Sequence, residues 1–212
     1  MADEADIEVI TQGDNESPAK SETTIGLSLD IESLDIGPRS VVTQVALYGW
    51  DIDEGTLLEA FVWSYLPIQP QLDLIHPRTI SADTLWWWMQ QSDEARSKFE
   101  FNVLEDFESL PVLMRHLTRE FNRMVGDNNY ELWAKGPQFD VVNVESLYRD
   151  CGMRAPWKYD RVRDLRTLMA QAGIHSADVE IPKGFVAHEA GWDAQFQINC
   201  YMQAMRHLRA RG

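Results

Sequence analysis

The chain has 212 residues, 44% of them hydrophobic, and a formal net charge of −15 at pH 7. This apolar content can fill the core of one sizeable domain, whereas no apolar run is long enough to cross a bilayer. The negative charge excludes a protein that binds nucleic acid by attraction over its whole surface. The chain has two cysteines, which excludes a disulfide framework and is typical of a reducing compartment.

Residues 1–24 predict a disordered acidic tail, because they hold seven acidic residues, one lysine and few apolar side chains. They lack the basic start and the apolar middle of a secretory signal, so we expect a cytoplasmic protein. Residues 25–212 are expected to form the domain. Within it, residues 149–166 carry six basic residues against three acids. An acidic protein with such a stretch can still hold a polyanion locally.

Three strands are predicted at the start of the domain. Residues 25–31 alternate apolar side chains with small or acidic ones, which is the period of a strand with one face in a core. Residues 41–51 and 56–66 predict a second and a third strand, which pair with the first as a meander. Residues 67–79 contain three prolines and predict a loop.

Residues 81–99 predict a helix that is capped by Ser81 or Asp83. Three consecutive tryptophans in it, Trp86, Trp87 and Trp88, cannot all point the same way on a helix. Therefore one or two of them must face a partner, a loop or a ligand. The run fits a core contact, a dimer contact or a platform on which bases stack, and the sequence leaves these three roles open.

The second half of the chain alternates helices and strands, which predicts a layered α/β domain. The strand at 130–136 is expected to run parallel to the first strand, because a helix separates the two. The expected elements are a helix at 107–125, this strand, a helix at 139–153, a short strand at 161–163, a helix capped by Asp164 and a last helix at 188–208.

Four acids lie near the ends of these elements. The alternation of the first strand puts Asp30 and Glu32 side by side on one face, where two carboxylates repel each other unless a cation lies between them. Asp140 opens a helix just after a strand, where the sites of open α/β sheets gather. Asp193 lies in the last helix, and His188 precedes it by five residues. Taken singly, each of these residues also fits a solvated or capping position.

In this order and in these elements, the five residues resemble the catalytic set of the DEDD exonuclease superfamily, DEDDh subgroup. The motifs are Asp-x-Glu on the first strand, an Asp that opens a middle helix, and His-x-Ala-x-x-Asp, in which Ala190 supplies the Ala. The segments "DIESLDIGPRSVV", "TLWWWMQQSDEAR", "LWAKGPQFD" and "PWKYDRVRDLRTL" are similar in particular to the branch of phage exodeoxyribonucleases and mycobacterial 3′–5′ exoribonuclease-like proteins. The resemblance covers residues 25–205, and Ser33 and Leu34 stand where many relatives have Thr-Thr or Thr-Gly.

The resemblance implies an RNase H-like exonuclease fold, a central mixed sheet flanked by helices. It implies a 3′–5′ exonuclease that hydrolyses phosphodiester bonds from the 3′ end of DNA, preferably single-stranded, and releases nucleoside 5′-monophosphates. His188 would act as general base. Two Mg²⁺ or Mn²⁺ ions, which prefer hard oxygen ligands, would serve as cofactors. The residues that would hold them are Asp30, Glu32, Asp140 and Asp193.

Substrate contacts are expected at two places. The backbone of Ile31, Ser33 and Leu34 would meet the terminal nucleotide, with the Leu34 side chain on its base. Arg163 and Arg166 would meet phosphates. The expected partners are the 3′ ends of single-stranded DNA or RNA, with no membrane, and a homodimer is left open. A phage-encoded protein of this kind would work in the cytoplasm of its bacterial host.

Two alternatives stand beside this interpretation. One is a 3′–5′ exoribonuclease, because telling RNA from DNA takes a specific contact to the 2′-hydroxyl that one sequence does not reveal. The other is a catalytically inactive nuclease-like module that binds nucleic acid or protein, with the acidic tail as its docking segment. The intact acids and histidine argue against this module, since binding alone has no need of such a costly set.

Overall fold

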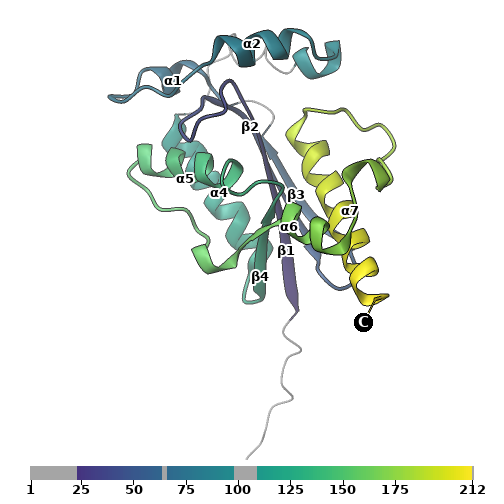
Figure 1. The fold of residues 1–212 in the computed structure, drawn as a ribbon. Helices are drawn as coiled ribbons and strands as arrows, with labels where there is room; N and C mark the ends of the chain where they lie inside the picture. Colours follow the sequence, from purple (N-terminus) through teal and green to yellow (C-terminus); the bar gives the residue numbers. More distant parts are fainter. Residues whose placement is uncertain (1–22, 64–65, 98–108, 212) are drawn as a thin grey trace, which may run out of the picture.

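A mixed sheet lies at the centre of the computed structural model, which describes residues 23–63, 66–97 and 109–211 (Figure 1). Within these residues the strand order is β3-β2-β1-β4-β5. The first three strands pair antiparallel, which confirms the predicted meander, and β4 is parallel to β1, also as predicted. The strands are β1 (Thr24–Ser33), β2 (Val42–Asp51), β3 (Leu57–Trp63), β4 (Asn129–Ala134) and β5 (Val162–Asp164).

The central strand β1 separates an apolar face from a polar one. Its odd-numbered residues from 25 to 31 are buried apolar side chains of the main core, so its even-numbered residues face the other side of the sheet. Gly26 is needed there, because a Cβ at this position would lie 2.3 Å from Cε2 of Trp50. A β-bulge between Glu32 and Ser33 ends the regular pairing with β2, and such bulges redirect side chains next to sites.

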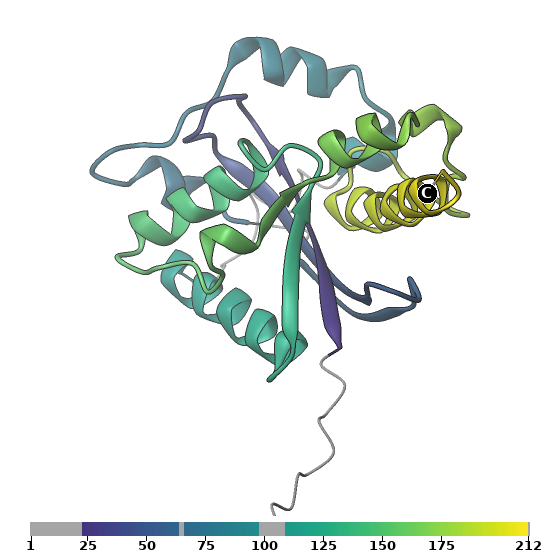
Figure 2. The ribbon, with the colours of Figure 1, turned by 60° about the horizontal axis from the view of Figure 1, so that its bottom comes forward.

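Helices cover both faces of the sheet (Figure 2). On one face, α4 (Leu110–Val125) and α5 (Asp140–Asp150) pack against the apolar side of β1. On the other face, α6 (Leu165–Ala172) and α7 (Ala190–Arg209) pack around two buried tryptophans of β2 and β4. This arrangement confirms the predicted α/β layers. No helix of the described ranges is long and apolar enough to span a membrane.

A single turn of helix, α1 (Gln69–Leu72), interrupts the stretch 67–79, which the sequence predicts to be a loop. Pro70 lies in its first turn, where the missing backbone N–H of proline costs no hydrogen bond. Gln71 is fully buried, and its side-chain amide donates to the carbonyl oxygens of Val42 and Pro67. A tertiary contact of this kind stabilises one helical turn that local sequence patterns do not reveal.

Above the end of the sheet in Figure 1 lies α2 (Ala82–Met89). Ser81 is its N-cap, and its hydroxyl accepts a hydrogen bond from the backbone N–H of Thr84, as predicted. The helix is shorter than the predicted 81–99, because the chain leaves it at Gln90 and helical residues resume only at 93. The last residues of that prediction lie outside the described part of the chain.

The helices of the C-terminal part begin at side-chain hydrogen bonds. Asp164 caps α6 by accepting from the backbone N–H of Arg166, as predicted. The last helix begins at Ala190 rather than at 188, so His188 lies in the preceding loop with a φ of +62°. Its backbone N–H donates to the Asp193 carboxylate at 2.9 Å. This bond closes the turn before the helix, and it explains why the predicted start is two residues too early.

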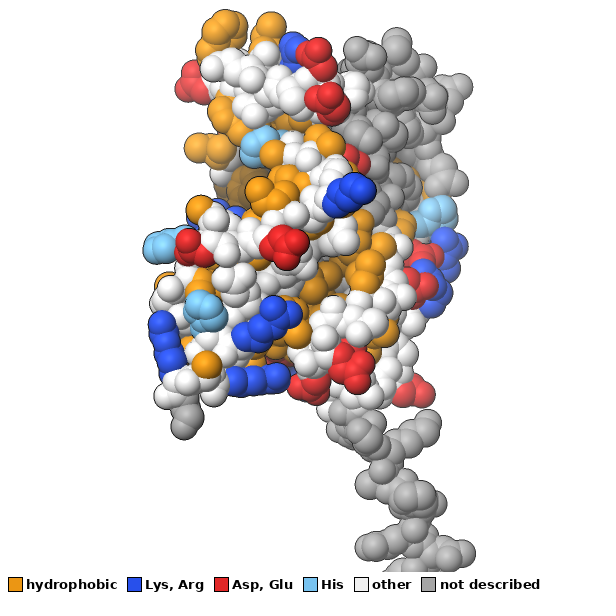
Figure 3. Space-filling view, turned by 90° about the vertical axis from the view of Figure 1, so that its right-hand side faces the viewer, with side chains coloured by type: hydrophobic (Ala, Val, Ile, Leu, Met, Phe, Trp, Pro, Cys, Tyr) orange, Lys and Arg blue, Asp and Glu red, His pale blue; other side chains and the backbone are white. Residues whose placement is uncertain are grey.

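Charge is spread unevenly over the surface. Figure 3 shows Lys and Arg side chains gathered near the C-terminal end of α7, where Arg206, Arg209 and Arg211 lie. The acidic tail predicted from the sequence falls on residues 1–22, outside the described ranges, and on the first two described residues.

Candidate active site

The C-terminal half of β1 supplies two carboxylates. Asp30 and Glu32 follow the buried apolar residues of the strand and lie on its polar face, with Glu32 only 9% exposed. Burial raises the pKa of both carboxyls well above the usual range, and the negative charges of Asp140 and Asp193 raise them further. The pair is therefore stable in its charged form only when a cation compensates it.

Asp140 reaches the same place from the first turn of α5. Because β4 is the parallel neighbour of β1, the loop that follows β4 ends beside the end of β1. Asp140 is 8% exposed, and burial raises its pKa to about 7. Backbone N–H groups of Asp140 and Ile31 and the charge of Arg166 oppose this shift.

Asp193 and His188 come from the start of α7 and the loop before it. Burial raises the pKa of Asp193, while its hydrogen bond from the His188 backbone and the charge of that histidine lower it. Gln44, which pairs with Glu32 across β1 and β2, accepts from the backbone N–H of Ala190 at 3.1 Å. This contact ties the first turn of α7 to the strand pair that carries Glu32.

These side chains line one hollow of about 390 Å³. Ligand atoms of Glu32, His188 and Asp193 all lie within 4.8 Å of one another. The structure thus brings together all five residues that the sequence singles out as catalytic: Asp30, Glu32, Asp140, His188 and Asp193. Buried, mutually repelling carboxylates with hard oxygen donors fit a divalent cation such as Mg²⁺ or Mn²⁺.

Gln197 is a member of the site that is not predicted from the sequence motifs. Its side-chain amide donates to Oδ1 of Asp30 at 2.6 Å, and its oxygen accepts from the Ser28 hydroxyl at 3.3 Å. Gln197 is 3% exposed and orients the Asp30 carboxylate from α7, which packs on the face of the sheet that carries Asp30. A signal for it exists in the sequence, because a residue four positions after Asp193 shares its helix face.

Two cationic side chains border the hollow, Arg166, which is predicted from the sequence, and Lys135, which is not. Arg166 lines it and donates from Nε to the carbonyl oxygen of Lys135 at 2.6 Å, and Lys135 lines it as well. Arg163, the other predicted phosphate contact, does not line it. Its guanidinium pairs with Glu131 and donates to the carbonyl oxygen of Asp160.

A second hollow of about 420 Å³ adjoins the first and shares Ile31, Glu32 and Phe139 with it. Ser33 lines this second hollow. Its apolar walls are Ile31, Ile36, Trp87, Trp88 and Phe139.

Leu34 lines neither hollow, because its side chain is 5% exposed and packs with Val41, Trp88 and Ala95. Its backbone N–H donates to Val41, and its carbonyl oxygen accepts from Ser81. The predicted contact of Leu34 with a base stays a prediction that this burial does not favour.

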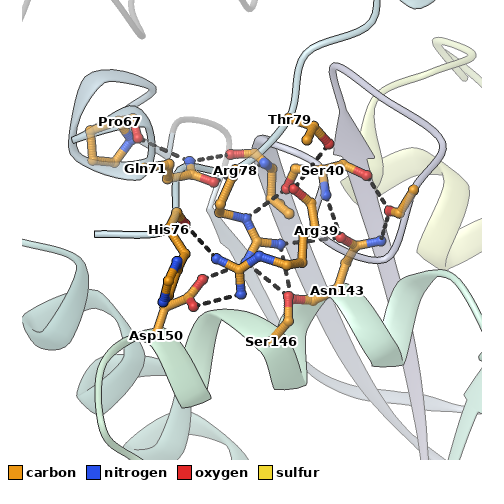
Figure 4. Close-up of polar contacts among 12 residues, drawn as sticks. Arg39, Ser40, Pro67, Gln71, His76, Arg78, Thr79, Asn143, Ser146 and Asp150 are labelled. Atoms are coloured by element: carbon orange, nitrogen blue, oxygen red, sulfur yellow. Dashed lines mark hydrogen bonds and ion pairs between the residues drawn. The ribbon is translucent and has the colours of Figure 1, made fainter. Parts of the chain in front are cut away.

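A buried arginine holds the elements of the site in place (Figure 4). Arg78 is 2% exposed and donates to the Ser40 carbonyl oxygen, the Ser146 hydroxyl and the Asp150 carboxylate. Asn143 accepts from the backbone N–H of Ser40 in the same network. The contacts fasten α5 to the turn after β1, so that Asp140 at the start of α5 keeps its place beside Glu32.

Comparison with known proteins gives one family and one fold. The family model described as the 3′–5′ exoribonuclease Rv2179c-like domain matches residues 26–205. A product-bound exonuclease I is similar in structure, with a TM-score of 0.52 and 13% identity over 89% of this chain and 46% of that chain. E. coli exonuclease I in complex with a dT13 oligonucleotide gives a TM-score of 0.53 and 14% identity, over 87% of this chain and 40% of that chain.

At such identities the likeness to exonuclease I shows the fold alone, and the chain spans less than half the length of those proteins. It confirms the predicted RNase H-like fold, a mixed sheet flanked by helices. No curated protein matches the chain.

Proposed function

The chain belongs to the family of the 3′–5′ exoribonuclease Rv2179c-like domain, and from this premise we propose that it removes nucleotides from the 3′ end of single-stranded nucleic acid by metal-dependent hydrolysis. It is thereby a member of the DEDD superfamily of 3′–5′ exonucleases. One observation carries the proposal: β1, α5, α7 and the loop before α7 direct four acids and a histidine into a single hollow. The DEDDh subgroup, the phage-like branch and release of nucleoside 5′-monophosphates are parts of the same proposal.

The four carboxylates are the proposed metal ligands. Two bound Mg²⁺ or Mn²⁺ ions would stabilise the attacking and leaving oxygens of an in-line displacement. Burial raises the pKa of the Asp30 carboxyl, and the charges of Asp140, Glu32 and Asp193 raise it further, so a cation beside this carboxylate would offset repulsion from all three. Gln197 donates a hydrogen bond to Oδ1 of Asp30. This bond fixes the plane of the carboxylate and thereby directs its other oxygen toward a ligand.

His188 is the proposed general base. It takes a proton from the attacking water, the usual role of histidine in such a site. Its ring lies at the edge of the carboxylate set, with a nitrogen within 4.8 Å of oxygens of Glu32 and Asp193. The loop conformation of His188 lets the ring reach the hollow without belonging to α7.

The proposed contacts with the nucleic-acid substrate lie in the two hollows, phosphates at the first and the terminal base at the second. Lys135 and Arg166, at the border of the first hollow, bind backbone phosphates, whose negative charge they offset. Phe139 and Ile36, two apolar residues that line the second hollow, contact the terminal base, with the Phe139 ring available for stacking. The backbone at Ile31 and Ser33 joins the two places and contacts the nucleotide between them.

The sugar preference is the part of the proposal that an experiment must decide. The name of the family refers to RNA, whereas the exonuclease I structure holds a DNA oligonucleotide. The sequence-based preference for single-stranded DNA stays a prediction, and an exoribonuclease is the alternative. Either substrate needs the same carboxylates and the same general base.

The test is a time course on 5′-labelled single-stranded DNA and RNA of equal sequence, with Mg²⁺, Mn²⁺ or EDTA. We expect a ladder that shortens from the 3′ end in the presence of metal, and the faster ladder identifies the preferred sugar. Asp30→Asn removes the activity. Asp53→Asn is the matched control, because Asp53 is exposed and lies in the turn between β2 and β3. Absence of cleavage by the folded wild type with either metal overturns the proposal and leaves a binding module.

A further inference from the structure

The imidazole of His188 needs an external support. The residue lies in a loop with a φ of +62°, and its backbone N–H is bound to Asp193. Among the described residues, neither ring nitrogen makes a hydrogen bond. A general base must be held in a defined orientation, since small misplacements cost large factors in rate. Packing against the ring is therefore what orients it.

Trp87 of α2 supplies that packing. The ring centroids of Trp87 and His188 are 4.7 Å apart with an interplanar angle of 78°, which is an edge-to-face contact. Trp88 approaches the same imidazole at 6.1 Å and 84°. Edge-to-face pairs at these distances are favourable and depend on the angle between the rings. The two indoles thus restrict the plane of the imidazole.

Helix α2 is itself fixed to the strand that carries the carboxylates. Trp88 is 4% exposed, and its Nε1 donates to the carbonyl oxygen of Ser33 at 2.9 Å. The backbone N–H of Ser81 donates to the carbonyl oxygen of Leu34 at 2.8 Å. One short helix therefore contacts both sides of the site, the end of β1 and the loop of His188.

We propose that Trp87 is a positioning residue, which holds the His188 imidazole toward the carboxylate set and so raises the rate of the chemical step. This inference rests on the proposed function, because it assigns Trp87 a part in that reaction. Trp87 also lines the second hollow, so the rival role is a contact with the terminal base. A base contact changes KM for substrates that carry a base, whereas a positioning residue changes kcat for all substrates.

The kinetic test compares Trp87→Ala, Trp87→Phe and Trp86→Ala on two oligonucleotides, one with an ordinary 3′-terminal nucleotide and one with a 3′-terminal abasic site. We expect Trp87→Ala to lower kcat by about tenfold or more on both substrates, with KM nearly unchanged. Trp87→Phe, which keeps an aromatic ring, retains most of the activity. Trp86→Ala is the matched control, because Trp86 is 64% exposed and lines neither hollow.

A spectroscopic readout tests the ring contact without turnover. In metal-free protein with labelled histidine, the Hε1 resonance of His188 is identified by its loss in His188→Asn. We expect Trp87→Ala to shift this resonance by removing the ring current of the indole, and Trp86→Ala to leave it in place. Thermal unfolding of each variant checks that the domain is folded.

Either of two kinetic results overturns the inference while the proposed function stands: kcat of Trp87→Ala equal to that of Trp86→Ala, or a loss confined to KM on the base-bearing substrate. A resonance of His188 that is unmoved in Trp87→Ala also overturns it. Failure of the proposed function looks different, because the wild type itself then cleaves neither oligonucleotide.

Discussion

At the scale of single residues, the site stores electrostatic repulsion. Asp30, Glu32, Asp140 and Asp193 each have a pKa raised first by burial. Neighbouring carboxylates add to that shift, so the charged set destabilises the metal-free protein. Structural needs alone do not explain such a cluster, whereas the proposed metal ions would turn the repulsion into affinity.

The first prediction concerns Asp30→Asn in EDTA. Removing the charge of Asp30 relieves the repulsion, so the variant should unfold at a higher temperature than the wild type. Its free energy of unfolding should be higher by on the order of 1 kcal/mol. With excess Mg²⁺ the order reverses, because the metal stabilises only the protein that binds it. Thermal unfolding with and without metal measures both. A variant that is less stable in EDTA contradicts the explanation.

The second prediction concerns pH in the absence of metal. The folded pKa of Asp140 is about 7, above its ordinary value of 3.8, so the folded state holds the proton more tightly than the unfolded state. This contribution to stability is complete below the ordinary value and is lost as the pH rises through about 7. Urea unfolding in EDTA at several pH values should show the decline between these limits. Asp140→Asn should show a flatter profile, and an equal slope in both proteins counts against the assignment.

At the scale of elements, local patterns predict the strands and most helices, since alternation in β1 and the caps at Ser81 and Asp164 are short-range signals. The differences arise where contacts distant in sequence decide. The turn of α1 depends on buried Gln71, and the late start of α7 depends on the bond from His188 to Asp193.

The candidate site shows the same division between local and distant contacts. Its acids and histidine are predicted from motif and element context. Lys135 and the orientation of Trp87 emerge only once the elements of the site are placed together. For Gln197 the sequence offers only its spacing of four from Asp193. Leu34 illustrates the opposite case, because a position beside the motif suggests a contact, whereas its side chain is buried.

The third prediction concerns Gly26 in β1. A Cβ there would lie 2.3 Å from the Trp50 indole, so Gly26→Ala must displace a fully buried ring between the sheet and its helices. Overpacking of this kind costs about 1–3 kcal/mol of unfolding free energy. Gly49→Ala on β2 is the control, since its Cβ would meet atoms at an ordinary 3.6 Å or more. Urea denaturation of both variants measures the difference, and equal stabilities would show that the ring moves freely.

At the scale of the whole molecule, the proposed function requires a protein with a net charge of −15 to bind a polyanion locally. Lys135 and Arg166 border the acidic hollow, whereas the guanidinium of Arg163 is engaged by Glu131. Long-range repulsion from the rest of the surface is screened at physiological salt. Under the proposed function, short-range contacts to phosphate would therefore supply the attraction for the nucleic-acid strand.

The fourth prediction separates these cations by the salt dependence of binding. In a His188→Asn background with Mg²⁺, Lys135→Gln and Arg166→Gln should each weaken binding of a fluorescent single-stranded oligonucleotide. Each should also reduce the slope of log Kd against log salt by about 1. Arg163→Gln should leave the slope unchanged. The assignment fails if the Arg163→Gln substitution reduces the slope and the Lys135→Gln and Arg166→Gln substitutions do not.

The bond between Asp30 and Gln197 joins residues 167 positions apart in the chain. A nascent polypeptide that has left the ribosome as far as α6 carries Asp30, Glu32 and Asp140, but it has neither His188 nor Asp193. Such an intermediate cannot complete the set, whatever metal surrounds it. During synthesis, the proposed catalytic set therefore stays incomplete until α7 docks on the sheet.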